Sequence, residues 1–295
     1  PSTSSTERAL ELVDRSGRAE RLLPRVGEFS DPRFSPDGRR VVLTVGSDIW
    51  LLDRLQGALT RLSFDSSATR AVWSPDGRRV AYVRQIGVLN DLRIMNADGS
   101  APPESLLALP AVGLWEVLFT PDGRSLVVRT AGGAAGVRDI LSVPLGSVAS
   151  PEPLLQSPAS EVAPAVSPDG RRMAYVSNES GRAEVYVRSF PDMRERTQVS
   201  VDGGSEPAWS PRGDELFYRS GAAFWKVDAQ PGPAFELRGR TLLFRDATLT
   251  TDLTHRTYDV APDGRQFLTV RNLEGRSHLK VTLNLLQNLA RSGEH

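Results

Sequence analysis

The 295-residue sequence contains no cysteine, which excludes disulfide bonds, thiolate metal sites and a thiol nucleophile. Lysine is almost absent as well: Lys226 and Lys280 are the only two, so arginine carries nearly all of the positive charge. The 36 basic side chains are balanced by 36 acidic ones, whereas nucleic-acid-binding domains usually carry net positive charge. No apolar run approaches the roughly 20 residues of a membrane-spanning helix. We therefore expect neither nucleic-acid binding nor direct membrane insertion of this domain.

The motifs of common catalytic classes are missing too. There is no glycine-rich loop followed by a strand lysine, no His-Arg-Asp and no Asp-Phe-Gly of a protein kinase. The run from Gly203 to Pro207 begins like a Gly-x-Ser-x-Gly nucleophile elbow but lacks the final glycine, and residues 132–136 are interpreted as a flexible loop. His255, His278 and His295 are too few and too scattered for a metal site. The sequence predicts a domain without catalytic residues, bound metal or cofactor.

What the sequence has instead is an internal repeat. The phrase Phe-Ser-Pro-Asp-Gly-Arg at residues 34–39 returns five times in related forms, with its proline 39, 46, 47, 43 and 51 residues further on each time. A period of this length, with several short strands in each repeat, is typical of propellers and other repeat arrays. Proline presets one φ of a β-turn, aspartate tolerates the next position and glycine takes the conformation that follows. Arg212 replaces the aspartate once, where Pro211 and Gly213 are expected to keep the turn.

Each repeat predicts four short strands. The residue two before the motif proline is apolar and large or β-branched, as expected between neighbouring sheets: Phe34, Trp73, Phe119, Val166, Trp209 and Val260. Third strands are expected at 48–52, 91–95, 139–143, 184–188 and 223–227, and fourth strands at 59–62, 104–107, 153–155, 197–200 and 241–244. Four antiparallel strands make one propeller blade. The predicted fold class is therefore all-β, a six-bladed β-propeller of four-stranded antiparallel blades.

The ring is predicted to close by pairing the two ends of the chain. An N-terminal hairpin, 10–15 and 19–23, resembles the second half of a repeat, and the sixth repeat supplies strands at 258–260, 267–270 and 278–283. Pairing them removes the exposed edges of an open array. Together the hairpin and the sixth repeat supply five strands, one more than a four-stranded blade needs. Either residues 285–291 form a short helix, or the last blade has five strands, or a seventh partial blade exists. We expect residues 1–8 to be a linker, 9–290 one propeller domain and 291–295 a tail, within a longer or processed protein.

The repeated Ser-Pro-Asp-Gly-Arg phrase resembles the WD40-like (PD40) repeats of TolB-type propellers over nearly the whole chain. It differs from the eukaryotic WD40 pattern, because no repeat has the Gly-His and Trp-Asp pair. The runs 203–209, 232–236, 258–260 and 281–286 are similar to the propeller that lies C-terminal to bacterial eukaryotic-like serine/threonine kinases. This resemblance implies an extracytoplasmic sensor domain, joined through a membrane helix to a preceding kinase. A cytoplasmic location stays open.

Propellers usually bind ligands at one end of the central channel, where the connection into each innermost strand lies. Five residues before the motif prolines are Asp31, Arg70, Glu116, Ala163, Glu206 and Thr257. Polar and aromatic residues adjoin these positions, which suits a peptide, a protein segment or a small polar ligand. The predicted ligand-binding residues at the channel mouth are Asp31, Arg70, Trp115, Glu116, Glu161, Glu206, His255 and Arg256.

Three hypotheses of function follow from this reading. The first is a non-catalytic sensor or interaction propeller of a membrane-bound serine/threonine kinase. The second is a stand-alone periplasmic TolB-like propeller that binds envelope proteins. The third is the accessory propeller of a prolyl oligopeptidase-like peptidase. A propeller that is itself a hydrolase or lyase is disfavoured, because such enzymes gather histidine or carboxylate ligands in the channel.

Overall fold

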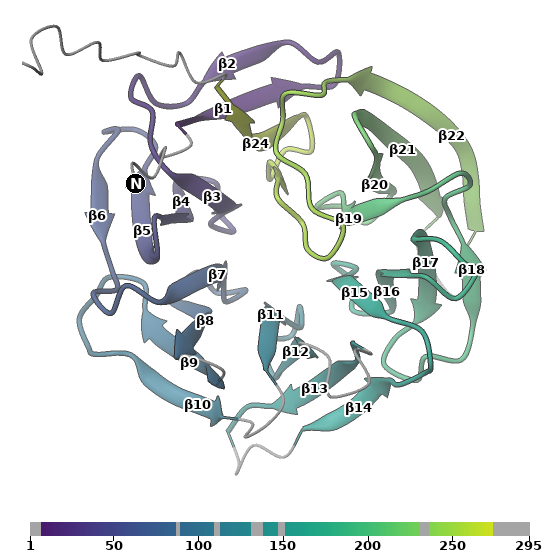
Figure 1. Ribbon diagram of the computed structural model, residues 1–295, viewed down its shortest axis with the longest axis horizontal. Helices are drawn as coiled ribbons and strands as arrows, with labels where there is room; N and C mark the ends of the chain where they lie inside the picture. Colours follow the sequence, from purple (N-terminus) through teal and green to yellow (C-terminus); the bar gives the residue numbers. More distant parts are fainter. Residues whose placement is uncertain are drawn as a thin grey trace, which may run out of the picture.

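The computed structural model describes residues 7–86, 89–108, 113–130, 138–146, 151–230 and 236–273. Regular structure in these residues consists of strands, which form six four-stranded antiparallel sheets around a central channel (Figure 1). The predicted six-bladed propeller is confirmed. No helix in the described part of the chain is long and apolar enough to cross a membrane.

Blades 1 to 3 follow one another along the chain, each numbered from the channel outward. Blade 1 consists of β3 (Phe29–Phe34), β4 (Arg40–Val45), β5 (Asp48–Asp53) and β6 (Leu59–Arg61). Blade 2 consists of β7 (Ala68–Trp73), β8 (Arg79–Ile86), β9 (Leu89–Asn96) and β10 (Glu104–Ala108). Blade 3 consists of β11 (Leu114–Phe119), β12 (Ser125–Thr130), β13 (Ile140–Pro144) and β14 (Glu152–Leu155).

Blades 4 and 5 repeat this order. Blade 4 consists of β15 (Glu161–Val166), β16 (Arg172–Ser177), β17 (Glu184–Ser189) and β18 (Arg196–Gln198). Blade 5 consists of β19 (Ser205–Trp209), β20 (Glu215–Ser220), β21 (Ala223–Gln230) and β22 (Glu236–Arg245).

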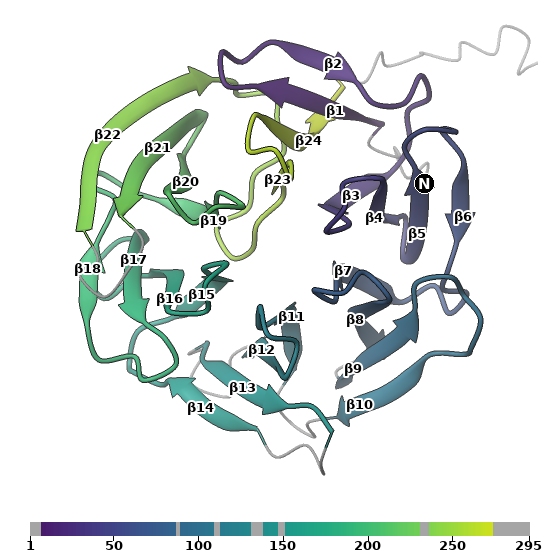
Figure 2. The same ribbon diagram turned by 180° about the vertical axis from the view of Figure 1, so that it is seen from behind.

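Blade 6 joins the two ends of the chain, as the sequence predicts. Its order from the channel outward is β23 (Asp259–Val260), β24 (Gln266–Asn272), β1 (Arg8–Asp14) and β2 (Ala19–Arg21), with β23 visible in Figure 2. Strand β1 pairs with β24 along its whole length, from Arg8 opposite Asn272 to Asp14 opposite Gln266. The N-terminal strand is therefore the third strand of this blade, directly beside β24. The strand expected at 278–283 and the helix expected at 285–291 lie outside the described residues.

The hydrophobic core is divided into six layers, one between each pair of neighbouring blades. The layer between blades 4 and 5, for example, combines Val176 and Val185 with Leu216 and Tyr218. The apolar residue two before each motif proline is buried in five blades, whereas Val166 of blade 4 is half-buried. Since each layer lies between two neighbouring blades, the core fixes the ring around the channel.

The repeated phrase forms one turn between the first and second strands of each blade. In blade 1, the Ser35 hydroxyl donates to Asp37 Oδ1 at 2.6 Å and accepts from the Arg40 amide at 2.9 Å. The same pair of bonds recurs at Ser74, Thr120 and Ser167. In blade 5, where Arg212 replaces the aspartate, Ser210 donates to Asp214 instead. The hydroxyl-to-carboxylate contact thus survives the departure from the motif.

The six motif turns lie together at one end of the channel, here called the motif face. Their glycines have φ between 67° and 74°, the left-handed region that glycine adopts without strain. At five junctions a methyl group on this glycine would lie 3.1–3.8 Å from the motif proline of the preceding blade. Gly170 of blade 4 is the exception, since a methyl group there would meet no atom within 4 Å. The space beside each motif glycine is therefore bounded by the motif proline of the preceding blade, except between blades 3 and 4.

Candidate functional site at the channel mouth

The innermost strands begin at the opposite end of the channel, here called the mouth. Five of them contain a register shift near their start, which is the sign of a β-bulge. At four of these bulges a residue other than glycine has positive φ: Asp31 (50°), Arg70 (55°), Ala163 (51°) and Glu206 (55°). Each lies five residues before its motif proline. Strained conformations of this kind cluster at binding sites, where the surrounding structure holds them in place.

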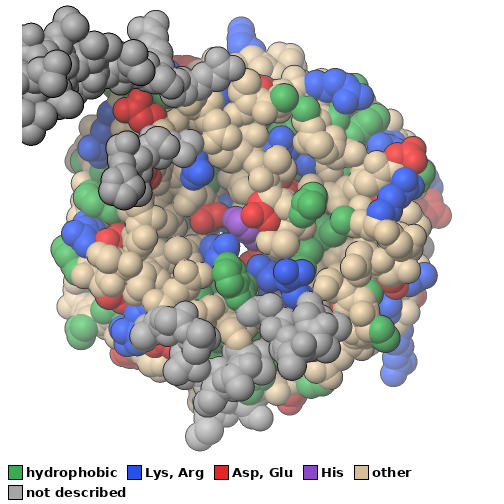
Figure 3. Space-filling view, viewed as in Figure 1, with side chains coloured by type: hydrophobic (Ala, Val, Ile, Leu, Met, Phe, Trp, Pro, Cys, Tyr) green, Lys and Arg blue, Asp and Glu red, His purple; other side chains and the backbone are tan. Residues whose placement is uncertain are grey.

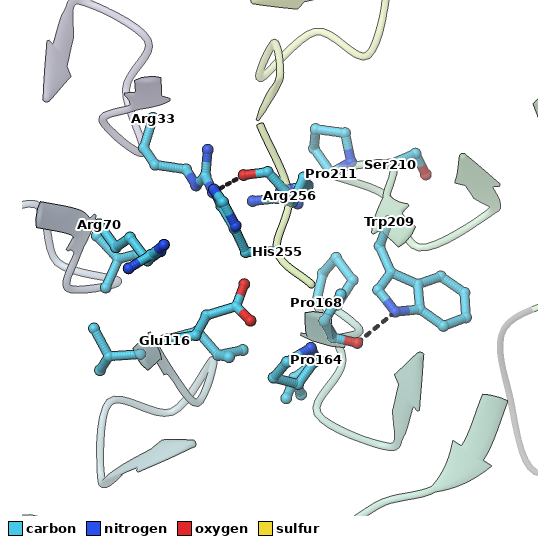
Figure 4. Close-up of a pocket in the computed structure, with 15 residues that line it drawn as sticks. Arg33, Arg70, Glu116, Pro164, Pro168, Trp209, Ser210, Pro211, His255 and Arg256 are labelled. Carbon is cyan, nitrogen blue, oxygen red and sulfur yellow. Dashed lines mark hydrogen bonds between the residues drawn. The ribbon is translucent and has the colours of Figure 1, made fainter. Parts of the chain in front are cut away.

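A cavity of about 180 Å³ lies in the channel and reaches from the mouth towards the motif face (Figure 4). Its charged and titratable lining residues are Arg33, Arg70, Glu116, His255 and Arg256. Pro164, Pro168, Pro211 and Trp209 line its other side (Figure 4). Figure 3 shows acidic, basic and histidine side chains gathered around the channel opening. Four of the eight predicted mouth residues line this cavity: Arg70, Glu116, His255 and Arg256.

His255 is held between two carboxylates. Its Nε2 lies 3.0 Å from Asp31 Oδ1, and its Nδ1 lies 3.3 Å from Asp252 Oδ1, an ion-pair distance without hydrogen-bond geometry. Burial disfavours the imidazolium, but the neighbouring carboxylates Asp252 and Asp31 outweigh it and raise the pKa of His255 to about 9. The ring is therefore protonated at neutral pH. It acts as a fixed cation that joins blade 1 to the loop before β23, and it cannot serve as a general base near pH 7.

Glu116 and Arg129 form a second charged pair in blade 3. Arg129 is only 2% exposed, and its Nε lies 3.4 Å from Glu116 Oε2. Its Nη2 is buried without a hydrogen-bond partner in the described structure. Burial is the main reason that the pKa of Arg129 is lowered, although Glu116 opposes the shift. The hydrogen-bonding groups of Arg129 are therefore only partly satisfied, although buried donors normally find partners.

Arg70 makes no salt bridge with a carboxylate of the described residues. Its guanidinium lies 5.0 Å from the centre of the Trp115 ring, a cation–π arrangement, and its Nε is buried without a hydrogen-bond partner among the described residues. Trp115 is 36% exposed and presents an apolar surface beside this charge. A guanidinium beside an exposed aromatic ring is a common anchor in binding surfaces.

Arg33 also lines the cavity without a salt bridge in the described structure. It donates to the backbone carbonyls of Pro32, Tyr258 and Arg256, and the last of these bonds is drawn in Figure 4. Arg256 itself lies 3.1 Å from Asp259. The sequence analysis missed Arg33, Arg129, Asp252 and Asp259. Arg33 and Asp259 share a signal that was available: they are the two charged residues at the third position before the proline, where the other four repeats have Val72, Leu118, Ala165 and Ala208.

The other four predicted mouth residues lie outside the cavity lining: Asp31 and Trp115, described above, and Glu206 and Glu161. Glu206 is completely buried and binds the loop before β23: its oxygens accept hydrogen bonds from the Thr251 hydroxyl, the Asp252 amide, and the Thr257 amide and hydroxyl. Glu161, at the start of β15, is 4% exposed and accepts from the Ser157 hydroxyl. Burial raises the pKa of Glu161. Glu206 thus fixes the loop that carries His255, while Glu161 belongs to the blade 4 end of the mouth.

The described residues contain no group of three or more histidine, aspartate or glutamate side chains that could hold a metal ion. The motif aspartates are turn formers: Asp37 and Asp76 each accept from the serine and the amide of their own turn. The serine hydroxyl bond is the main cause of the lowered pKa of these carboxyls.

Comparison with known proteins finds relatives among TolB proteins. The chain is 24% identical over 210 residues to the Tol-Pal system protein TolB of Francisella tularensis, an alignment that covers 67% of this chain and 47% of the relative. The chain resembles TolB. It spans about half the length of the curated relatives that it matches. No protein-family model matches the sequence.

Solved structures show the same fold. A candidate TolB from Agrobacterium tumefaciens superposes with a TM-score of 0.70 at 18% identity, covering 92% of this chain and all of the other. An oligogalacturonate lyase from Vibrio parahaemolyticus superposes with a TM-score of 0.59 at 12% identity, covering 88% of this chain and 78% of the other. Since that second propeller carries the name of an enzyme, likeness of fold leaves the function to be argued from the site. The resemblance to TolB-type propellers is supported both in sequence and in fold.

Proposed function

We propose that this propeller binds a peptide, a protein segment or a small polar ligand at the channel mouth, without catalysing a reaction. The observation that carries the proposal is the lining of the channel cavity. Arg33 and Arg70 line it without a carboxylate partner in the described structure, beside the exposed ring of Trp115. Two guanidinium groups that make no direct salt bridge in the described structure favour, in a concave site, a ligand that brings an anionic group.

The pairing of the remaining charges supports the same proposal. His255 is neutralised by Asp31 and Asp252, Arg256 by Asp259, and Arg129 by Glu116. A carboxylate of a peptide would therefore meet Arg70 first, with Trp115 at its apolar flank. Both ring nitrogens of His255 face carboxylates, so the histidine holds its charge in a fixed place. A fixed arrangement of charges suits ligand binding.

The test begins with a probe of defined sequence. Peptides selected from a random 12-residue library against the immobilised propeller are synthesised, and their affinity is measured by isothermal titration calorimetry. We expect Arg70→Ala and Trp115→Ala to weaken binding by about tenfold or more each, the usual effect of losing an interface anchor. Arg78→Ala, an exposed arginine of the motif face, and Phe64→Ala are the controls.

Phe64 is a matched control because it is also an exposed aromatic ring under an arginine, with the Arg61 guanidinium 4.9 Å from its centre. Equal losses for Trp115→Ala and Phe64→Ala would show that aromatic exposure alone governs peptide capture. Peptides whose affinity ignores Arg70 and Trp115 would overturn the placement of the site.

For the protein to which this propeller belongs, we propose the extracytoplasmic sensor or interaction domain of a bacterial serine/threonine kinase. The resemblance of the closing repeats supports it. A stand-alone periplasmic TolB-like propeller accounts for the comparisons equally well, and an accessory propeller of a peptidase is the third possibility. The intact mass and peptide map of the native gene product distinguish them: a kinase at the N-terminus supports the first, a product of propeller size the second, and a Gly-x-Ser-x-Gly hydrolase domain the third.

A further inference from the structure

The junction between blades 3 and 4 is open on the motif face. A cleft of about 470 Å³ lies there, within the size range of roughly 300–1,000 Å³ that is usual for small-ligand sites. Its walls include the rings of Pro121, Pro168, Phe190 and Pro191. It lies where Gly170 lacks the proline contact that closes the other five junctions.

At the junction between blades 1 and 2, Arg40 reaches the motif glycine of the next blade, and two other arginines bind the motif glycine of their own blade. The Arg40 guanidinium donates to the carbonyl of Gly77, that of Arg54 to Gly38, and that of Arg15 to Gly264, at 3.1, 2.6 and 3.0 Å. Motif glycine carbonyls of this fold therefore bind guanidinium groups repeatedly.

Each of these three guanidinium groups also lies against an aromatic ring. The distances from the guanidinium carbon to the ring centre are 4.8 Å for Arg40 over Trp73, 5.0 Å for Arg54 over Phe34 and 5.3 Å for Arg15 over Phe217. The recurring arrangement is thus a carbonyl oxygen for hydrogen bonding and an aromatic face for stacking, both of which suit arginine better than lysine.

The open cleft offers comparable groups without the arginine. Ser125 of blade 3 occupies the position that Arg40 occupies in blade 1, four residues after the motif proline, and its side chain lines the cleft. The Gly170 carbonyl lines the cleft without an arginine of the described residues upon it, and Phe190, which follows β17, supplies an aromatic ring in the wall, whereas Val166 stands at the position of Trp73. With serine in place of arginine at this position, the space beside the Gly170 carbonyl can accept a guanidinium group from another molecule.

Charge in the cleft is complementary to arginine. Asp122 and Asp169 line it, whereas no lysine or arginine belongs to its described lining. Each aspartate uses Oδ1 in its own turn, and Oδ2 accepts no side-chain or turn hydrogen bond from the described residues, so it can accept from a ligand. The hydrogen bond from Thr120 is the main cause of the lowered pKa of Asp122, so this carboxyl is ionised at neutral pH.

We propose that the cleft between blades 3 and 4 binds an arginine side chain presented by an exposed peptide segment of a partner protein. The guanidinium donates to the Gly170 carbonyl and to Asp122 or Asp169, and its apolar stem lies against the proline rings and Phe190. This site is on the opposite end of the channel from the mouth and is independent of the ligand proposed there.

The probe is the peptide acetyl-Gly-Arg-Gly-amide, and the readout is its titration into the ¹⁵N-labelled propeller, followed by NMR. We expect saturable shifts of the Gly170 and Phe190 amides, and none of Gly77, whose carbonyl Arg40 already occupies. The peptide with citrulline in place of arginine has the same shape without the charge, and we expect it to leave these amides unshifted. Equal shifts for both peptides, or no saturable shift at Gly170 with the arginine peptide, would overturn the proposal.

Two pairs of variants locate the site. Ser125→Arg supplies the missing arginine from within the chain and should abolish the shifts, whereas Ser125→Ala should keep them. Asp122→Asn with Asp169→Asn removes the charge but keeps an oxygen for each turn, and should weaken binding by about tenfold. Asp37→Asn with Asp76→Asn makes the same change at closed junctions and should have little effect. Equal weakening by both double variants would show general electrostatic attraction and contradict a site in this cleft.

Discussion

The two ends of the channel are built from the same six strands, but they differ in how much they repeat. On the motif face, Ser35, Ser74 and Ser167 make the same hydrogen bonds in their own turns. At the mouth, the residues five before each proline are of five types, since only Glu116 and Glu206 agree, and four of the six are strained non-glycine residues. A requirement of the fold acts on every blade alike, whereas a ligand contacts each blade differently. Repetition along the sequence therefore marks the scaffold, and departure from it marks the places where binding is expected.

The largest loss of stability is expected on substitution of Glu206, a mouth residue that supports the fold and so limits the contrast between the two ends. Glu206→Ala removes the acceptor of four hydrogen bonds and leaves Arg219, which is 1% exposed, without its carboxylate at 3.7 Å. Breaking a buried ion pair on one side costs about 3–5 kcal/mol. Urea unfolding measures this change. Glu20→Ala, at an exposed strand position, is the control, and a cost of Glu206→Ala similar to that control would contradict the role of Glu206 as the anchor of the loop.

The next effect is a pH dependence that arises at the mouth. The pKa of His255 is raised to about 9 in the folded state, so folding favours its protonated form. The stabilisation is complete below the unfolded pKa near 6.5 and is lost as pH rises to about 9, by at most about 3 kcal/mol. The pKa values of Asp31 and Asp252 are lowered, so both stay ionised across this window.

The measurement is the free energy of unfolding between pH 6 and 10, compared with His255→Asn. We expect the slope between about pH 6.5 and 9 to be present in the original protein and absent in the variant. An unchanged slope in His255→Asn would assign the pH dependence to other groups.

A smaller and uniform effect is expected on the motif face. Ser35→Ala and Ser74→Ala each remove a hydroxyl that bonds the turn aspartate and the amide five residues on, so each should cost about 1–2 kcal/mol. Ala261 stands at this place in blade 6, and Ala261→Ser should be neutral or stabilising because Asp263 is present. Thermal unfolding of the three variants tests the equivalence of the turns. Costs for Ser35 and Ser74 that differ by more than about 1 kcal/mol would contradict it.

The smallest effect on stability is expected from the mouth residues that we assign to binding. Arg70→Ala and Trp115→Ala should each change the free energy of unfolding by no more than about 0.5 kcal/mol, because neither side chain is fully buried or salt-bridged. Chemical denaturation of both variants checks this. A loss of several kcal/mol would place these residues in the scaffold and remove the contrast between the two ends.

The sequence predicts the fold well because the fold is repeated six times. The turn phrase, the apolar position two before it and the order of strands recur, so chance agreement is unlikely at each step, and Asp214 even replaces the aspartate missing at position 212. The closing blade was harder: closure by the two ends of the chain was predicted, but the direct pairing of β1 with β24 and its register were not.

The site was predicted only in part. Counting five residues back from each proline finds Asp31, Arg70 and Glu116, because a bulge at that point is a property of the repeat. It cannot tell that Glu206 is buried and bonded to a loop, since Thr251 and Thr257 lie 45 and 51 residues further on. Contacts between blades depend on the closed ring, and no local pattern of residues reports them.

The most direct test of the contrast between the two ends is amide hydrogen exchange of the propeller with and without a peptide selected for binding. The account predicts slower exchange in segments 29–33, 68–72, 114–117 and 250–258, which form the mouth, and unchanged exchange in the motif turns. Protection that is confined to the motif turns, with the mouth segments unchanged, would contradict it.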